Sequence, residues 1–190
     1  MESSAKLFIE QILPESELLA LSSEADRRMV AGFGIERRRR EALMWRYILR
    51  RELGSDIEIS YNEVGAPQIT NRTEYIGISH SNDHVAVIIS HNRCAVDIER
   101  LDRNFERVTA RYLHPEEQAL SSDERLSATI WSAKETLYKF SGKRGLDFMH
   151  EIRVLEVDFE NGILVGQIEE MQPIRMQFEF HSGNIVVYIA

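Results

Sequence analysis

The stretch "WSAKETLYKF", Trp131–Phe140, carries the pattern from which the fold of this chain can be worked out. It ends a longer segment, residues 121–140, in which apolar residues recur every three or four positions. These residues are Leu126, Ile130, Ala133 and Leu137. This spacing predicts an amphipathic helix with one face in the core. The pair Ser121 and Glu124 resembles a capping box at its start, and Gly142 follows its end.

Working outward, the chain passes twice from helical patterns to strand patterns. In the first part we expect a strand at 6–13, helices at 15–33 and 35–53, and strands at 56–61, 74–79, 84–90 and 93–99. In the second part we expect helices at 103–113, 115–120 and 121–140, then strands at 151–159, 163–170, 174–180 and 184–190. Helices and strands in separate runs are typical of an α+β protein.

Two of the strand segments resemble each other. Residues 77–89, "GISHSNDHVAVII", and residues 178–190, "FEFHSGNIVVYIA", both contain His-Ser, a turn and an alternating Val/Ile strand. The echo suggests two similar α+β halves joined near residue 100. Short hairpins also resemble one another by chance, so the pattern alone leaves duplication open.

Composition excludes several classes of protein. The chain has 190 residues, of which 43% are hydrophobic, enough for one domain or two small halves. Its net charge of −8 argues against a general nucleic-acid binder. The single cysteine, Cys94, excludes an internal disulfide framework and a Cys-rich zinc site. No apolar stretch has the length of a membrane span or the form of a signal peptide, so we expect a soluble, cytoplasmic protein without a membrane partner.

The strand "AVDIER" places two carboxylates on one face, because side chains alternate along a strand. Asp97 and Glu99 lie on that face, and Val96 and Ile98 lie on the other. Two carboxylates so placed can bind one divalent cation such as Mg²⁺. The alternative is an edge strand whose polar face is simply solvated.

A second face of the helix at 121–140 carries Trp131, Glu135, Tyr138 and Lys139. Glu135 and Lys139 are spaced as an i,i+4 surface ion pair, which contributes only a few tenths of a kcal/mol. A second interpretation makes Glu135 a third carboxylate beside Asp97 and Glu99, with Lys134 and Lys139 binding phosphate at the same ion. A cation and a phosphate would then balance the carboxylates.

Basic and hydroxyl-bearing residues provide further candidates. Residues 36–51 contain seven arginines, of which Arg39, Arg46 and Arg50 lie near one helical stripe. They form either a solvated face or a phosphate site, since guanidinium groups match phosphate geometry. "GISHSND" places Ser79 and His80 where a strand gives way to a turn, which suits a phosphate or ribose. His80 can equally serve as a structural hydrogen-bonding residue.

The ordered set of motifs resembles the 4′-phosphopantetheinyl transferases, in particular their larger monomeric type with two similar halves, the surfactin-synthetase-activator type. The resemblance extends from about residue 27 to residue 148 and rests on five segments: "RRREALMWRYILRREL", "GAPQI", "ISHSND", "AVDIER" and "WSAKETLYKFSGKRGLDF". There are two departures. Ala95 stands where the metal motif usually begins with Gly, and Ala66 stands where a lysine often assists coenzyme A binding.

The resemblance implies an α+β fold of two similar halves in a pseudo-twofold arrangement, 1–100 and 101–190, with the active site in the cleft between them. It implies transfer of 4′-phosphopantetheine from coenzyme A to a serine of an acyl or peptidyl carrier protein, with release of 3′,5′-ADP. The partners would be these two molecules, with no nucleic acid or membrane, and the enzyme would be a monomer. Lys143 and Arg144 would help to attract an acidic carrier protein.

The resemblance also implies roles for individual residues. Asp97, Glu99 and Glu135 would bind Mg²⁺, and Glu135 would also accept the proton of the incoming serine. Lys139 and Lys134 would contact the pyrophosphate. Ser79, His80, Arg39 and Arg46 would contact the 3′-phosphate and nucleotide. Two alternatives remain: a non-catalytic module that binds coenzyme A or a carrier protein, and another Mg²⁺-dependent phosphotransferase or phosphodiesterase acting on nucleotides.

Overall fold

The computed structural model describes residues 5–190, and at position 106 the backbone alone. Its elements in chain order are β1 (Lys6–Gln11), α1 (Glu15–Leu21), α2 (Glu24–Ala31), α3 (Glu36–Leu53), β2 (Ile59–Tyr61), β3 (Pro67–Ile69), β4 (Tyr75–His80), β5 (His84–Ser90), β6 (Ala95–Arg100), the 3₁₀ helix η1 (Glu106–Arg111), α4 (Pro115–Gln118), α5 (Leu126–Ser141), β7 (Ile152–Asp158), β8 (Ile163–Ile168), β9 (Ile174–His181) and β10 (Asn184–Ile189). Helices and sheets are both present, so the predicted α+β class is confirmed.

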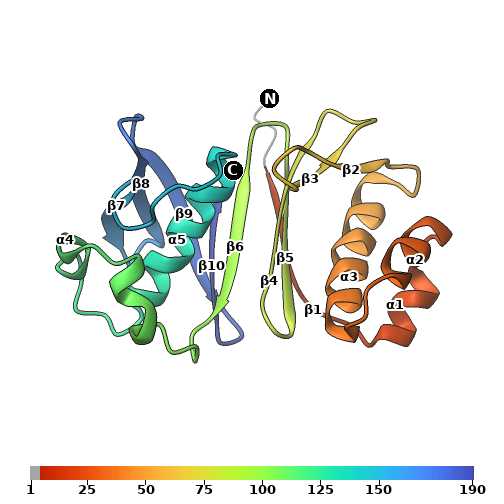
Figure 1. Ribbon diagram of the computed structural model, residues 1–190, viewed down its shortest axis with the longest axis horizontal. Coiled ribbons are helices and arrows are strands. Elements are labelled where there is room, and N and C mark those ends of the chain that lie inside the picture. The colour runs from red at the N-terminus through yellow and green to blue at the C-terminus, as the bar shows by residue number, and fades with distance from the viewer. Residues whose placement is uncertain (1–4) are drawn as a thin grey trace.

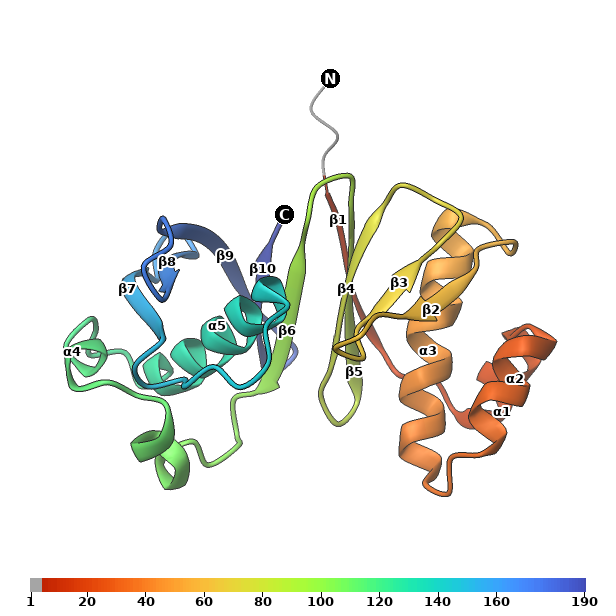
Figure 2. The same cartoon turned by 45° about the horizontal axis from the view of Figure 1, so that its top comes forward.

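The strands form two larger antiparallel sheets and one small hairpin. The first sheet has the order β1-β5-β4, the second has the order β6-β10-β9-β8-β7, and β2 pairs with β3 alone. Figures 1 and 2 show β4, β5 and β6 in the middle of the molecule. Helices α1–α3 lie on one flank and α4 and α5 on the other. The central strands therefore lie between the two flanks, where their side chains can meet residues from either flank.

The two sheets share a strand order. In each sheet, the strand that comes first in the chain pairs with the strand that comes last, and this last strand also pairs with the one before it in the chain. The resulting order is β1-β5-β4 in the first sheet and β6-β10-β9 in the second. The two segments that resemble each other in sequence are the hairpins β4–β5 and β9–β10. Strand β6, which the sequence analysis places in the first half, pairs with β10 in the second sheet. If the chain is divided according to its two larger sheets, the boundary therefore falls between β5 and β6.

Helix α3 begins and ends close to where the sequence predicts. Gly54 ends it with a φ of 105°, and its N–H donates to the carbonyl of Arg50 at 3.0 Å. Its buried residues pack with β5 in the core of the N-terminal flank. They include Leu43, Ile48 and Leu49, each 0% exposed. The arginine-rich helix is therefore a core element as well as a basic one.

The helix predicted at 15–33 is wrong as a single element. It is divided into α1 and α2 at Ser22 and Ser23. Ser23 caps α2, because its Oγ accepts from the N–H of Asp26 at 3.1 Å and donates to the Asp26 carboxylate at 2.6 Å. A serine that satisfies the free N–H groups of a new helix favours a break at that point.

Three further predictions differ from the structure. The helix expected at 103–113 is a 3₁₀ helix at 106–111. Helix α5 begins at Leu126 rather than at Ser121, because Asp123 accepts from both the N–H and the side chain of Arg125 and forms a turn before it. The short strand β3 lies between the strands predicted at 56–61 and 74–79, where no element is predicted.

The two sheets approach closely at Gly77 of β4. A Cβ atom at this position would lie 3.0 Å from the Cα of Ala95 and 3.1 Å from the backbone nitrogen of Val96, both on β6. It would also lie 2.8 Å from a methyl group of Ile88. Around this contact is a small apolar core that includes Ala86, Val96 and Ile98. None of the helices in residues 5–190 combines the length and apolarity needed to cross a bilayer.

Candidate active site

The polar residues of the predicted site converge on Asp97, which is 4% exposed. Its Oδ1 accepts from the Oγ of Ser79 on β4 at 2.9 Å and from the Nζ of Lys139 on α5 at 2.7 Å. Its Oδ2 accepts from the Oγ of Ser132, also on α5, at 2.9 Å. One carboxylate on β6 thus joins a strand of the first sheet to the helix of the second.

Lys139 does not form the i,i+4 pair with Glu135 that its spacing allows. Its ammonium instead contacts Asp97, the hydroxyl of Ser79 at 2.9 Å and the carbonyl of Val96 at 3.1 Å. The side chain retains 32% exposure. Lys139 is therefore anchored at the site and still open to a ligand.

Glu99 lies two residues along β6 and is held from another direction. Its Oε1 accepts from the indole Nε1 of Trp131 at 2.7 Å and from Nη1 of Arg103 at 2.7 Å. Trp131 packs edge-on against Tyr112, with ring centres 5.0 Å apart, and against Phe148 at 5.7 Å. Trp131 thus fixes the position of a carboxylate while its ring forms part of an aromatic cluster.

Glu135 is the least compensated of the three predicted carboxylates. Among residues 5–190 no hydrogen bond or ion pair reaches its side chain, which is partly buried. Burial and the charge of Asp97 raise the pKa of Glu135 to about 7, against the opposing charge of Lys139. A carboxyl group with this pKa exists in both protonation states near neutral pH.

Oxygen donors of this type suit a hard divalent cation, and the uncompensated Glu135 carboxylate is a group that such a cation would stabilise. The three side chains do not yet form one ligand set, however. In the part of the chain that the structure describes, no three His, Cys, Asp or Glu side chains are gathered closely enough to hold a metal ion. Lys139 lies on Asp97 and Arg103 lies on Glu99, so protein cations contact two of the three carboxylates.

Lys134 does not take part in this arrangement. It is 0% exposed and forms an ion pair of 2.7 Å with Glu117, which is also 0% exposed. Its ammonium also donates to the carbonyls of Tyr112 at 2.5 Å and Phe148 at 2.7 Å. The expected pyrophosphate contact of Lys134 therefore disagrees with its placement, because every ammonium proton has a partner inside the protein.

Arg39 and Arg46 are likewise engaged in the N-terminal flank. Arg39 forms two hydrogen bonds with the carboxylate of Glu15, at 2.5 and 3.1 Å. Arg46 is 3% exposed, lies 3.4 Å from the Asp26 carboxylate and donates to the hydroxyl of Tyr61 at 2.6 Å. The expected nucleotide contacts of both residues do not fit these placements.

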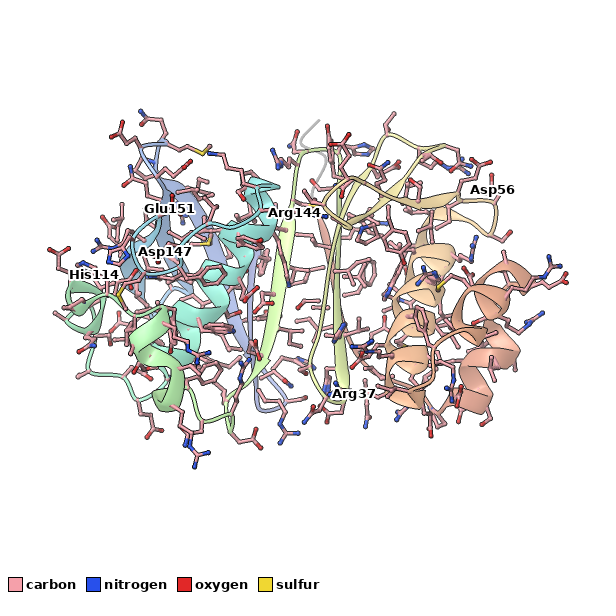
Figure 3. All side chains as sticks on the ribbon, in the orientation of Figure 1. Arg37, Asp56, His114, Arg144, Asp147 and Glu151 are labelled. Atoms are coloured by element: carbon pink, nitrogen blue, oxygen red, sulfur yellow. The ribbon has the colours of Figure 1, made fainter. Side chains whose placement is uncertain are left out.

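Arg37 is the arginine of this helix that lies near His80. Both side chains contact Glu41, with the Nε of Arg37 and the Nδ1 of His80 each 3.5 Å from its Oε1. Arg37 is exposed, with 61% of its side-chain surface accessible. Arg37 and Arg144 lie near opposite ends of the region between the two flanks (Figure 3).

Cavities border the site on several sides, and three of them contain its charged residues in different combinations. The hairpin cavity, about 450 Å³, is lined from both flanks by residues 64–67, 76–78 and 94–96, by Tyr138 and Lys139, and by residues 142–144. The histidine cavity, about 500 Å³, is lined by Arg37, Glu41, residues 80–82, Glu99, Arg100, Asp102 and Arg103. The aromatic cavity, about 690 Å³, is lined by Arg103, Val108, Ala110, Arg111, Trp131, Glu135 and residues 147–150. Lys139, Glu99 and Glu135 thus each border a different cavity.

Comparison with known families decides the affiliation. The family described as the 4′-phosphopantetheinyl transferase superfamily matches residues 93–190, about half of the chain. The chain belongs to this superfamily. Membership indicates a transferase of the phosphopantetheinyl transferase type. Comparison with curated proteins gives no match.

The matched segment of this superfamily member begins just before β6 and contains Asp97, Glu99, Glu135 and Lys139. It leaves out Ser79, although this residue of the first sheet contacts Asp97 directly. The first flank therefore contributes to the candidate site through contacts that lie outside the matched residues.

Three further residues of the candidate site were not predicted from the sequence. Ser132 lies within the quoted helix and contacts Asp97, but a serine at that position gives no signal distinct from helix packing. Arg103 is the only side chain in the described residues that forms an ion pair with Glu99, and its i,i+4 spacing from Glu99 was visible in the sequence. Arg37 belongs to the arginine run but was not chosen from it.

Proposed function

We propose that this chain transfers the 4′-phosphopantetheine group of coenzyme A to a serine of an acyl or peptidyl carrier protein, in a magnesium-dependent reaction that releases 3′,5′-ADP. The observation that carries this proposal is the convergence of Ser79, Asp97 and Lys139 beside a carboxyl group, Glu135, whose pKa is raised to about 7. Membership in the superfamily supplies the reaction class. The site supplies an anchored cation and a group able to accept a proton.

We assign the nucleotide of coenzyme A to the hairpin cavity. Its walls include Pro67, Ile76 and Ile78, which offer apolar surface to a planar base. Lys139 lies on its wall and Lys143 and Arg144 also line it, so positive charge is available to the phosphates. We assign a further phosphate contact to His80, with Arg37 rather than Arg39 or Arg46 as the neighbouring arginine.

Ala66 occupies the hairpin position where the family often has a lysine. The side chain of Arg144, from the loop after α5, donates to the backbone carbonyl of Glu63 in the same hairpin at 2.6 Å. We propose that Arg144 provides the positive charge that Ala66 lacks. This contact joins the two flanks across the hairpin cavity.

The reaction forms a bond between the serine oxygen of the carrier protein and the phosphorus of the phosphopantetheine group. It breaks the bond from that phosphorus to the 3′,5′-ADP oxygen. Glu135 accepts the serine proton, directly or through a water molecule, and a pKa near neutrality suits this role. Lys139 donates to the departing pyrophosphate oxygens, where negative charge develops. Asp97, Glu99 and Glu135 would hold Mg²⁺, which when bound would neutralise phosphate charge.

We assign the carrier serine and the pantetheine arm to the aromatic cavity. Glu135 lies on its wall together with Trp131 and Phe148, and the gem-dimethyl group and methylene segments of the arm can pack against aromatic rings. The chain itself is acidic, so a carrier protein, which is typically acidic as well, would approach at local basic residues such as Lys143 and Arg144.

We further propose that the chain is of the larger, two-half type and acts as a monomer in the cytoplasm. The shared strand order β1-β5-β4 and β6-β10-β9 supports an internal repeat of the two halves. The sequence echo between the β4–β5 and β9–β10 hairpins supports the same repeat. On this proposal the boundary between halves lies in residues 91–94 rather than at residue 100.

The deciding experiment incubates the protein with coenzyme A, Mg²⁺ and an apo carrier protein and analyses both products by mass spectrometry. The proposal requires a carrier protein heavier by one phosphopantetheine group and an equal amount of 3′,5′-ADP. Glu135→Gln should lose the reaction, whereas Glu124→Gln, an exposed glutamate just before α5, should retain it.

Two other outcomes would replace the proposal. Binding of coenzyme A without any product would indicate a non-catalytic module. Hydrolysis or phosphate transfer in the absence of a carrier protein would indicate a different nucleotide phosphotransferase or phosphodiesterase.

A further inference from the structure

Arg103 is a positive residue at the edge of the carboxylate site. It lies in the turn after β6, and its guanidinium donates to Oε1 of Glu99 at 2.7 Å. It also lies over the ring of Trp131, 5.1 Å from the ring centre, and over Phe105 at 5.3 Å. It borders both the histidine cavity and the aromatic cavity. The side chain therefore stands between the two cavities, at the edge of the site.

The charge balance of the site depends on Arg103. Three carboxylates, Asp97, Glu99 and Glu135, face two cations, Lys139 and Arg103. Arg103 contacts Glu99 directly and lines the aromatic cavity together with Glu135, so its charge lies near both carboxylates. A divalent cation added to this arrangement meets two positive groups as well as three negative ones.

The two protein cations differ in how firmly they are held. The ammonium of Lys139 contacts three residues, Ser79, Val96 and Asp97, all of which are buried. Arg103 has one ion pair, and 44% of its side-chain surface is exposed. Water reaches the Arg103 side of this pair and screens it, so we expect Arg103 to leave Glu99 more readily than Lys139 leaves Asp97. Of these two cations, Arg103 is therefore the easier one to displace from its carboxylate.

We propose that Arg103 is an internal counter-ion of the three-carboxylate site, which weakens binding of a divalent cation alone and so couples binding of that cation to binding of the pyrophosphate-bearing substrate. The inference rests on the proposed function, because it takes Asp97, Glu99 and Glu135 as the metal ligands. The negative charge of the pyrophosphate offsets the repulsion between Arg103 and the metal ion. Cation and substrate then each tighten the binding of the other by the same factor.

The test measures binding of Mn²⁺ to the full chain by titration calorimetry, with and without saturating coenzyme A and without carrier protein. In the wild type, coenzyme A should tighten Mn²⁺ binding by on the order of tenfold. In Arg103→Ala, Mn²⁺ alone should bind at least about fivefold more tightly than in the wild type, and the effect of coenzyme A should shrink by a similar factor. Arg103→Lys, which keeps the charge, should stay close to the wild type.

Arg107→Ala is the matched control, since it removes the same charge four residues on, and no described hydrogen bond or ion pair joins that side chain to Glu99. It should leave Mn²⁺ binding unchanged. If Mn²⁺ binding in Arg103→Ala is unchanged or weaker, the counter-ion role is overturned, and weaker binding would mean that Arg103 orients Glu99 for the metal. A separate comparison tests the metal site itself: Glu135→Gln should weaken Mn²⁺ binding, and if it does not, the proposed ligands are wrong whatever Arg103 does.

Discussion

The ammonium of Lys139 lies 2.7 Å from Oδ1 of Asp97 on the neighbouring strand, and not on Glu135, one helical turn away on its own helix. The Glu-x-x-x-Lys spacing of this helix therefore does not correspond to a surface ion pair within the helix. Lys139 is the residue through which α5, β6 and, by way of Ser79, β4 meet. The helix is thereby fixed against both sheets at the point where the chemistry is proposed.

Replacing Lys139 by alanine should lower kcat and kcat/KM together. If the ammonium donates to the departing pyrophosphate, its contribution is largest in the transition state, and its loss should reduce the rate by about 10²–10³. Lys139→Arg should recover only part of the rate, because a planar guanidinium does not replace a compact ammonium. The measurement is single-turnover transfer to a carrier protein at saturating coenzyme A.

An unchanged rate in Lys139→Ala would leave the residue with a structural role alone. Thermal unfolding measures that structural role, since the loss of the Lys139 hydrogen bonds to the Ser79 hydroxyl, the Val96 carbonyl and the Asp97 carboxylate lowers stability. For the same reason Asp97→Ala is a poor probe of catalysis. Asp97 is 4% exposed and accepts from three side chains, so its removal takes an acceptor from Ser79 and Ser132 and the paired charge from Lys139.

Breaking the buried pair of Lys134 and Glu117 should act on stability rather than on coenzyme A binding. Lys134→Met leaves a buried carboxylate without its partner, which typically costs about 3–5 kcal/mol. The double variant Lys134→Met/Glu117→Gln removes both charges and should recover much of this loss. Denaturant unfolding measures the stability of each variant. A higher KM for coenzyme A in Lys134→Met, with stability unchanged, would restore Lys134 to the pyrophosphate site.

Among the basic residues, Arg37 and His80 should affect recognition of the 3′-phosphate. Replacing either by alanine should raise KM for coenzyme A more than for 3′-dephospho-coenzyme A, because only coenzyme A carries the 3′-phosphate with which the contact would be lost. Arg39→Ala is the control from the same helix: it should lower stability by removing the pair with Glu15 and leave the ratio of the two KM values unchanged. An equal change for both ligands in the Arg37 and His80 variants would assign these residues to another part of the substrate.

The ion cluster of Asp26 with Arg46 and Arg50 should make stability depend on pH. Burial tends to raise the pKa of Asp26, but the hydrogen bonds from Arg50 and Ser23 outweigh it, and the net shift is downward from 3.8. A lowered pKa stabilises the folded state at pH above the unfolded value, and this contribution is lost as pH falls through the folded value. Asp26→Asn should therefore cost about 3 kcal/mol at neutral pH, and its difference from the wild type should shrink below pH 3.8.

Urea unfolding across this pH range checks the Asp26 prediction. Asp56→Asn is the matched control, because Asp56 also pairs with an arginine but has 71% of its side chain exposed. Its effect should be small at every pH. A difference between Asp26→Asn and the wild type that stays constant into acid would show that the charge of Asp26 is not what stabilises the fold.

Much of the fold could be predicted from the sequence because its elements are local. The apolar spacing of Leu126, Ile130 and Leu137 is that of a buried helix face, and all three are buried in α5. The strands were recognisable from their alternating pattern. Boundaries that depend on a competing local contact were missed. The Ser23 cap divides a helix, and the turn at Asp123 delays the start of α5.

The partners of the polar residues were less predictable, because they come from distant segments. The residues around Lys134 do not indicate that it will form a buried ion pair with Glu117. Those around Arg39 likewise do not indicate its ion pair with Glu15. A lysine next to a candidate carboxylate is ordinarily exposed, so the pattern favoured a ligand contact. The region around Asp97 was correctly singled out as polar, but its contact with Ser79 requires the two sheets to approach, which no local pattern encodes.

That approach depends on Gly77, where β4 passes β6 with no room for a side chain. A methyl group there would have to displace the backbone at Ala95 and Val96, and so would widen the distance across which Ser79, two residues along β4, reaches Asp97. In a mutational scan Gly77 should thus rank with the polar site residues in its intolerance of substitution, although it carries no group that could touch a substrate.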